Sequence, residues 1–310
     1  MKKIEFNCHL CGSTDFRKIA NYKSINKIFE KKNIIECERC SIKLIYPIPD
    51  EKKLKEYNEN YFLNAHKDLK LDKIAETYFN CIAKCRVNFL ESFLKKKNIN
   101  IKQVLEIGPG KGHFYKNFIK SNSVMYSVLE PDVNLQKVLQ EKNIKVYKQY
   151  EQISENQYDL IIFSHVLEHI SNPNDFLKKI NKFLRKGGVI FLEVPCLDYL
   201  YKDLVEPHIF FYDKKSLSNL LNKNDFKKHN IFYFGKKIKE MKNKHLNKQF
   251  KFKFTNLLLR LNLDFLINCK NEHEYAFLKN KNEKIIANMY EMNSSKNEPS
   301  WWIRALAIKN

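Results

Sequence analysis

This chain of 310 residues lacks long apolar runs, and that absence narrows what it can be. No uninterrupted run reaches the length of a membrane-spanning helix; even Leu257–Ile267 is broken by Arg260 and Asp264. The first residues have no apolar core of the kind that a secretory signal carries, and no internal repeat is visible. We therefore expect a cytoplasmic protein that does not insert into a membrane.

The sequence holds eight cysteines, which in a cytoplasmic protein should be reduced. Reduced cysteines are better interpreted as metal ligands or core residues than as disulfides. Cys81 and Cys85 are one helical turn apart and are expected to be buried, whereas Cys196 and Cys269 are isolated.

The other four cysteines form two pairs with metal-ligand spacing. Each pair, Cys8-x-x-Cys11 and Cys37-x-x-Cys40, can present two thiolates on one side of a tight turn. Together the pairs can complete a closed tetrahedral site, which favours a structural Zn²⁺ ion in a small ribbon. The alternative is four reduced thiols without a metal.

Charge and composition say less about function. Hydrophobic residues make up 44% of the chain, enough for a packed core, and the formal net charge is +21. Such a charge suits an anionic partner, but lysine, asparagine and isoleucine are abundant throughout the sequence. We interpret the charge as a compositional bias and expect no stable complex with nucleic acid.

An alternation of strand and helix signals dominates the middle of the chain. It follows a long amphipathic helix whose apolar positions run from Leu71 to Phe89 and which closes at 95–98. The predicted strands are Gln103–Ile107, Val124–Leu129, Ile144–Tyr147, Tyr158–Phe163, Val189–Val194, Lys228–Phe234 and Trp301–Ile308. The predicted helices are Lys111–Lys120, Asp132–Lys142, Pro173–Leu184 and Lys214–Asn222, with Gly187-Gly188 stopping the third. This rhythm predicts an α/β fold with a mostly parallel sheet covered on both faces.

Composition shifts divide the chain into five predicted parts. The prolines at 47 and 49 end a zinc ribbon over residues 1–50, and a helical linker or lid follows over 51–100. Residues 101–235 form the ligand-binding α/β domain. Residues 236–298 are a basic helical insertion, and 299–310 return as the final strand of the sheet.

A glycine-rich turn lies where the first strand of the α/β domain meets its first helix. It reads Glu106-x-Gly108-x-Gly110-x-Gly112, and such a turn lets a ligand approach the backbone at a helix N-terminus. His113 stands where a dinucleotide fingerprint needs glycine. An acid before the turn, and a second acid that ends the next strand, suit a ligand with an ammonium group and a ribose. A turn without a ligand and an NAD site remain the alternatives.

The stretch from Val104 to Phe234 resembles a class I methyltransferase that uses S-adenosylmethionine (SAM). The matching motifs are Glu106–Gly112, Glu130, Tyr158–His169 and Leu184–Gly188. The resemblance implies a Rossmann-like, doubly wound sheet of seven strands, the last antiparallel and inserted near the edge, and S-adenosylhomocysteine (SAH) as product. It places Glu106 and the glycines at the methionine part of SAM, Glu130 at the ribose, and residues 149–151 near adenine. The implied cofactor-binding residues are Glu106, Gly108, Pro109, Gly110, Gly112, Glu130, Pro131, Gln149, Tyr150, Ser164 and His165.

The N-terminal region adds a second resemblance. The run from Cys37 to Pro49, followed by Tyr57 and Tyr61, resembles the N-terminal domain of deoxysugar C-methyltransferases and of shorter relatives in bacterial surface-glycan pathways. In those enzymes the ribbon and the helices after it help to close over the substrate.

Methyl transfer to a hydroxyl needs a group that accepts a proton. The candidates are His165, Glu168, His169 and His208, which follow predicted strands whose carboxyl ends face the ligand crevice. The sugar C-methyltransferases have a tyrosine shortly before a similar histidine, but this chain has Val205 there. That departure favours an oxygen or nitrogen acceptor over carbon. His208 as the cap of a loop, and Glu168 and His169 as the start of a helix, are the structural alternatives.

The leading hypothesis is therefore a SAM-dependent methyltransferase that modifies a sugar, a nucleotide-linked sugar or a sugar-linked phosphate in surface-glycan biosynthesis (capsule, O-antigen or flagellar glycan). The expected partner is a small nucleotide-activated or glycan-precursor sugar, and a homodimer is possible. The alternatives are an RNA methyltransferase, a nucleotide-deoxysugar C-methyltransferase and a binding module without turnover.

Overall fold

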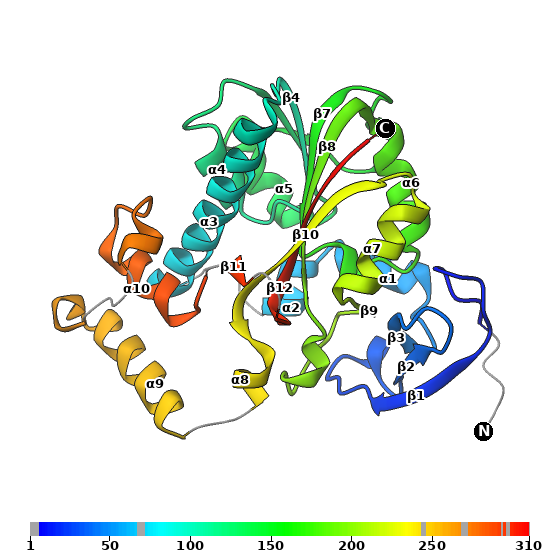
Figure 1. Ribbon diagram of the computed structural model, residues 1–310, viewed down its shortest axis with the longest axis horizontal. Coiled ribbons are helices and arrows are strands. Elements are labelled where there is room, and N and C mark those ends of the chain that lie inside the picture. The colour runs from blue at the N-terminus through cyan, green and yellow to red at the C-terminus, as the bar shows by residue number, and fades with distance from the viewer. Residues whose placement is uncertain are drawn as a thin grey trace.

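The computed structural model describes residues 6–66, 72–242, 246–267, 272–292, 294–295 and 298–309. A large central sheet is flanked by helices on both faces, and a small sheet near the N-terminus lies beside its lower end (Figure 1). Within these ranges no helix is both long and apolar enough to cross a membrane.

The large sheet has the strand order β11-β10-β12-β8-β7-β4-β5-β6. Its strands are β4 (Gln103–Ile107), β5 (Met125–Leu129), β6 (Lys145–Tyr147), β7 (Tyr158–Ser164), β8 (Leu184–Pro195), β10 (Lys228–Lys237), β11 (Ser294–Ser295) and β12 (Ser300–Ile308). Strands β6, β5, β4, β7 and β8 run parallel, and β12 is antiparallel to both of its neighbours. Seven of these strands make the Rossmann-like sheet that the sequence predicts, and β11 adds two residues at its edge.

The boundary before β8 differs from the predicted one. The helix before β8 ends at Phe183, and the strand already begins at Leu184, which pairs with Tyr158 of β7. The glycines at 187 and 188 therefore lie inside the strand, where a Cβ on Gly188 would come within 2.9 Å of the Arg185 carbonyl oxygen. The final strand is antiparallel and inserted near the edge, as the resemblance implies, because β12 lies between β8 and β10.

Helices cover both faces of the sheet, with α3 and α4 on one side and α6 and α7 on the other (Figure 1). The bounds of the helices in this domain are α3 (Lys73–Lys97), α4 (His113–Phe118), α5 (Val133–Gln140), α6 (Pro173–Phe183) and α7 (Lys214–Lys223). The long helix α3 is confirmed: Asp72 caps its start, and Asn98 in a left-handed conformation ends it. Its buried Leu90 packs in one cluster with Leu160 and Phe191, so α3 is part of the core of this domain.

The small sheet joins the N-terminal region to a segment far along the chain. Its order is β1 (Phe16–Asn21), β2 (Asn33–Cys37), β3 (Lys43–Tyr46) and β9 (Phe210–Phe211). Strand β9 lies after β8 in the sequence and pairs antiparallel with β3. Helices α1 (Glu51–Asn58) and α2 (Tyr61–His66) then lead toward α3.

The described residues of the region from 236 to 298 are largely helical. It contains α8 (Ile238–Lys242), α9 (Leu246–Arg260) and α10 (Lys281–Met289). Leu259 of α9 and Ile285 of α10 pack in a cluster with Cys81 and Cys85 of α3. The expected burial of these two cysteines is confirmed, whereas Cys269 lies outside the described residues.

Candidate active site

The glycine-rich turn connects β4 to α4 in a conformation that glycine favours. Gly108, Gly110 and Gly112 all have positive φ, at 64°, 55° and 73°. A Cβ atom on Gly108 would come within 2.7 Å of the Val166 side chain, so the loop after β7 lies directly on this turn. The Pro109 carbonyl accepts a hydrogen bond from the Gly112 N–H, which closes the turn.

Two buried acids lie beside the turn. Glu106 is 4% exposed and accepts a 2.7 Å hydrogen bond from the Tyr126 hydroxyl; burial raises its pKa to about 7. Glu130 is also 4% exposed, and the backbone N–H groups of Asp132 and Gly110 donate to its carboxylate. Burial nevertheless raises the pKa of Glu130 to about 8. A cation and hydroxyl donors placed here would stabilise both carboxylates in their ionised form.

The other residues implied for the cofactor differ in their surroundings. Pro131 and Gln149 are exposed. The Tyr150 ring packs against Phe176 and Phe183 of α6, with ring centroids 6.2 and 6.5 Å away. Ser164 ends β7, and its buried hydroxyl has no hydrogen-bond partner.

His165 is held between two carboxylates. Its Nδ1 lies 3.2 Å from Oε1 of Glu168, and its Nε2 lies 3.3 Å from Oε1 of Glu193. Burial alone would lower the pKa of His165, but these two contacts outweigh burial and raise it. The residue has a φ of 56°, which is uncommon outside glycine and often marks a functional position.

Glu193 belongs to a buried charge network that the sequence analysis missed. It lies opposite Arg304 in the β8–β12 pairing, and the two side chains form an ion pair. Arg86 of α3 adds a second contact at 2.5 Å. Burial would raise the pKa of Glu193, but the two arginines hold it well below its usual range. The signal was available: a single acid and a single arginine interrupt two predicted buried strands.

Glu168 and His169 lie in the short helical turn Leu167–His169 after β7. Glu168 is 1% exposed, and its Oε2 has no hydrogen-bond partner among the residues that the structure describes. Its Oε1 lies 3.9 Å from Nε2 of His169. The His169 ring packs edge-on against Tyr61 of α2 at 5.5 Å, and burial lowers the pKa of His169 to about 4. Helix α2 therefore contacts this cluster directly.

His208 is paired with an acid that the sequence analysis did not single out. Its Nδ1 lies 2.8 Å from Oδ2 of Asp198, which is 1% exposed and also lies 3.0 Å from the Lys202 ammonium. Burial would raise the pKa of Asp198, but His208 and Lys202 lower it. The rings of His208 and His169 are 4.9 Å apart. An acid directly after the carboxyl end of β8 was the signal that could have found Asp198.

The small sheet holds the segment that carries His208. The Ile209 N–H donates to the Glu168 carbonyl at 2.7 Å, and the Ile209 carbonyl accepts from the Ile45 N–H at 2.9 Å. One carboxylate oxygen of Glu206 accepts from the backbone N–H groups of Ile25 and Asn26 at 2.8 and 3.0 Å. His208 is thus fixed between the loop after β7 and the N-terminal region.

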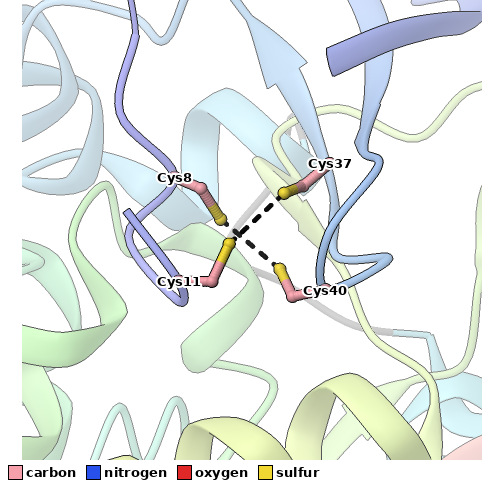
Figure 2. Close-up of side chains that lie close together, drawn as sticks. All are labelled: Cys8, Cys11, Cys37 and Cys40. Carbon is pink, nitrogen blue, oxygen red and sulfur yellow. Dashed lines mark hydrogen bonds between the residues drawn. The ribbon is translucent and has the colours of Figure 1, made fainter. Parts of the chain in front are cut away.

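The four N-terminal thiols converge on one point (Figure 2). The Sγ atoms of Cys8 and Cys40 are 3.5 Å apart, as are those of Cys11 and Cys37. Tetrahedral zinc with Zn–S bonds of about 2.3 Å requires sulfur atoms about 3.8 Å apart. The backbone N–H after each second cysteine returns to the carbonyl of the first at 2.8 Å, so both turns have the same geometry. The four thiols could therefore hold one tetrahedral ion.

A second group could also bind a metal. Glu168, His169 and His208 each offer one ligand atom, and these atoms lie within 4.8 Å of one another. Unlike the thiols, however, both histidines already contact an oxygen of the protein through Nδ1, at Pro207 and Asp198.

Comparison with known proteins agrees with the fold. Residues 80–231 match a family model described as a methyltransferase domain. A SAM-dependent methyltransferase from Thermotoga maritima, described as a possible histamine N-methyltransferase, superposes with a TM-score of 0.52 at 13% identity, covering 83% of this chain and all of that one. A putative sarcosine dimethylglycine methyltransferase from Galdieria sulphuraria gives 0.46 at 16% identity, covering 72% of this chain and 85% of that one. No curated protein matches the sequence.

The sheet order, the glycine turn and the matched family together define a class I SAM-dependent methyltransferase domain. The chain is accordingly a methyltransferase, and SAM is its methyl donor.

Proposed function

We propose that this enzyme transfers the methyl group of SAM to an oxygen, or alternatively a nitrogen, of a sugar or sugar-linked group. The pairing of His208 with Asp198 carries this proposal. A histidine whose Nδ1 faces a buried carboxylate keeps Nε2 available to accept a proton, and the carboxylate stabilises the cation that forms.

The donor site follows from the acids and the turn. Glu106 holds the ammonium group of the methionine part, and the Gly108–Gly112 backbone lies along the same part. Glu130 accepts hydrogen bonds from the ribose hydroxyls. The reach of Val166 to Gly108 brings the loop with Ser164 and His165 to the methionine side.

In the reaction an acceptor oxygen attacks the methyl carbon, and the carbon–sulfur bond breaks to give neutral SAH. The hydroxyl proton passes to Nε2 of His208, whose charge Asp198 balances. His165, whose two ring nitrogens face the carboxylates of Glu168 and Glu193, positions the acceptor. The unpartnered Oε2 of Glu168 accepts a hydrogen bond from a neighbouring hydroxyl of the sugar.

The role in a surface-glycan pathway rests on the pairing of a four-cysteine ribbon with this domain. A closed Cys₄ set suits a structural ion, so we propose that Cys8, Cys11, Cys37 and Cys40 bind Zn²⁺. The ion would stabilise the small sheet that holds the His208 segment.

Labelled SAM with a panel of nucleotide sugars, glycan precursors and bulk RNA tests the proposal. We expect label in a sugar acceptor, in a base-stable ether or amine, and none in RNA. Label bound to carbon would restore the C-methyltransferase alternative, and label in RNA would replace the sugar acceptor altogether.

A further inference from the structure

The segment from α9 to the short turn Asp264–Leu266 exposes more large apolar side chains than its length explains. Twelve such side chains are exposed in the part of the chain that the structure describes, and five of them lie between 254 and 266. They are Phe254, Leu257, Leu261, Phe265 and Leu266, with exposed fractions of 51% to 66%. Clustered exposed apolar surface of this kind marks an interaction site.

The spacing gives α9 two apolar faces. Leu258 and Leu259 point inward and are 8% and 5% exposed, with Leu259 packed in the cluster that includes α3 and α10. Phe254, Leu257 and Leu261 follow each other at intervals of three and four, so they form one stripe on the opposite side. Packing within the fold explains the inner face and leaves the outer stripe without a function.

The sequence that carries this stripe is rich in lysine and arginine. Residues 236–264 carry nine lysine or arginine residues and only two acids. The resulting +7 is one third of the net charge of the chain, in less than a tenth of its length. This concentration corrects the interpretation that the charge is spread evenly. The partner of the stripe should therefore be apolar and also anionic, which disfavours a second copy of the same basic face.

We propose that α9 and the 264–266 turn dock on an anionic lipid surface. The outer stripe enters the boundary between headgroups and acyl chains, while the exposed Lys253 meets the headgroup charges. Helix α9 and the small sheet lie on opposite flanks of the carboxyl ends of the strands (Figure 1). Docking through α9 would thus keep the candidate active site on the membrane side of the protein, within reach of an acceptor carried by a lipid.

Sedimentation with vesicles tests this proposal on the full chain. We expect the protein to bind vesicles of phosphatidylcholine with about one quarter phosphatidylglycerol, and to be released as salt rises. The variant Leu257→Ser/Leu261→Ser/Phe265→Ser should lower the bound fraction at least about tenfold, because three exposed apolar groups no longer leave water. Lys253→Glu should weaken binding less, and only to the anionic vesicles.

Met125→Ser is the matched control, since Met125 is 62% exposed on the far end of β5 and should not affect binding. Thermal unfolding of each variant shows that the fold is retained. Equal binding by the triple variant, or no binding by the wild-type chain at low salt, would overturn the proposal. A wild-type dimer in light scattering that the triple variant converts to a monomer would assign the stripe to a second copy instead. Transfer to a water-soluble sugar is unaffected by this variant if the proposed function holds, so the two proposals fail separately.

Discussion

The proposed donor side and the proposed acceptor side of the site differ in how far along the chain their residues are scattered. The donor side uses Glu106–Gly112 and Glu130, at the ends of two adjacent parallel strands. The acceptor side combines the loop after β7 with the Asp198–His208 segment, and α2 and the N-terminal sheet pack against it. Local sequence determines the first arrangement, whereas the second exists only after long-range packing.

The two sides should therefore respond to different substitutions. The donor side depends on backbone conformation and on two buried carboxyl groups, and substitution of a single residue can disrupt either. The acceptor side depends on the alignment of segments about 180 residues apart, such as Ile25 and Glu206. The two halves come close at Gly108, where an added Cβ would meet the Val166 side chain. The predictions below separate donor binding from acceptor chemistry.

The largest effect is expected for His208→Ala. Loss of the proton acceptor should lower kcat by about 10²- to 10⁴-fold, while SAM affinity changes little because the donor side is intact. Single-turnover kinetics and calorimetry of SAM binding measure the two quantities. Asp198→Asn is the companion variant and should also lower kcat, because its carboxylate no longer stabilises the cation that forms on His208. Unchanged turnover in His208→Ala would remove His208 as the proton acceptor.

A smaller effect should follow Gly108→Ala. The added Cβ would meet Val166 at 2.7 Å in a left-handed conformation, which together cost about 1–3 kcal/mol of folding stability and weaken SAM binding. Gly110→Ala is the matched control, because it has a similar φ and no atom within 4 Å of its Cβ. Thermal unfolding without SAM measures the loss of folding stability, and the stabilisation that added SAM gives measures the loss of SAM binding. Adding Val166→Ala should rescue Gly108→Ala in part, and an equal loss in the two glycine variants would show that the contact is unimportant.

This contact also shows how much the sequence could predict. The strand–turn–helix pattern around Glu106 and Gly108 identifies the fold and the donor turn, because both are local and repeat a recognisable motif. Strand β9 could not be predicted, since two residues carry no periodicity and their partner β3 lies at 43–46. Asp198 was missed although it follows β8 closely, because its importance comes from a contact with His208 across a loop.

The pH dependence of SAM binding should be moderate. In the free protein, burial raises the pKa of Glu106 to about 7 and that of Glu130 to about 8, so both are largely protonated below those values. A ligand that favours the ionised forms must release these protons. Affinity should therefore rise between pH 6 and pH 8 and then level off. Calorimetry in two buffers of different ionisation enthalpy counts the protons released. In Glu106→Gln the slope of SAM affinity against pH should fall. A slope equal to that of the wild type would contradict the proposal that Glu106 binds SAM.

A weaker effect is expected for Glu206→Gln, which tests the link between the N-terminal sheet and His208. The variant removes a charge-assisted contact with the N–H groups of Ile25 and Asn26. We expect a loss of about 1 kcal/mol in transition-state stabilisation, or about fivefold in kcat, with SAM affinity unchanged. Glu38→Gln, an exposed position in the same region, is the control. If both variants have the same kcat, the contact of Glu206 with the N–H groups of Ile25 and Asn26 has no catalytic role.

The smallest expected effect is that of a mild chelator, which should leave turnover unchanged. Glu168, His169 and His208 are close enough to bind a cation, but both histidines already have protein oxygens at Nδ1, and His208 is needed as a free base. Three of the four clustered cysteines, Cys8, Cys37 and Cys40, are buried, so the cluster should keep a structural ion during brief treatment. Activity with and without added Mn²⁺ after dialysis, with zinc content measured in parallel, checks this expectation. Activity that Mn²⁺ restores at constant zinc content would assign the acceptor-side cluster to a cation.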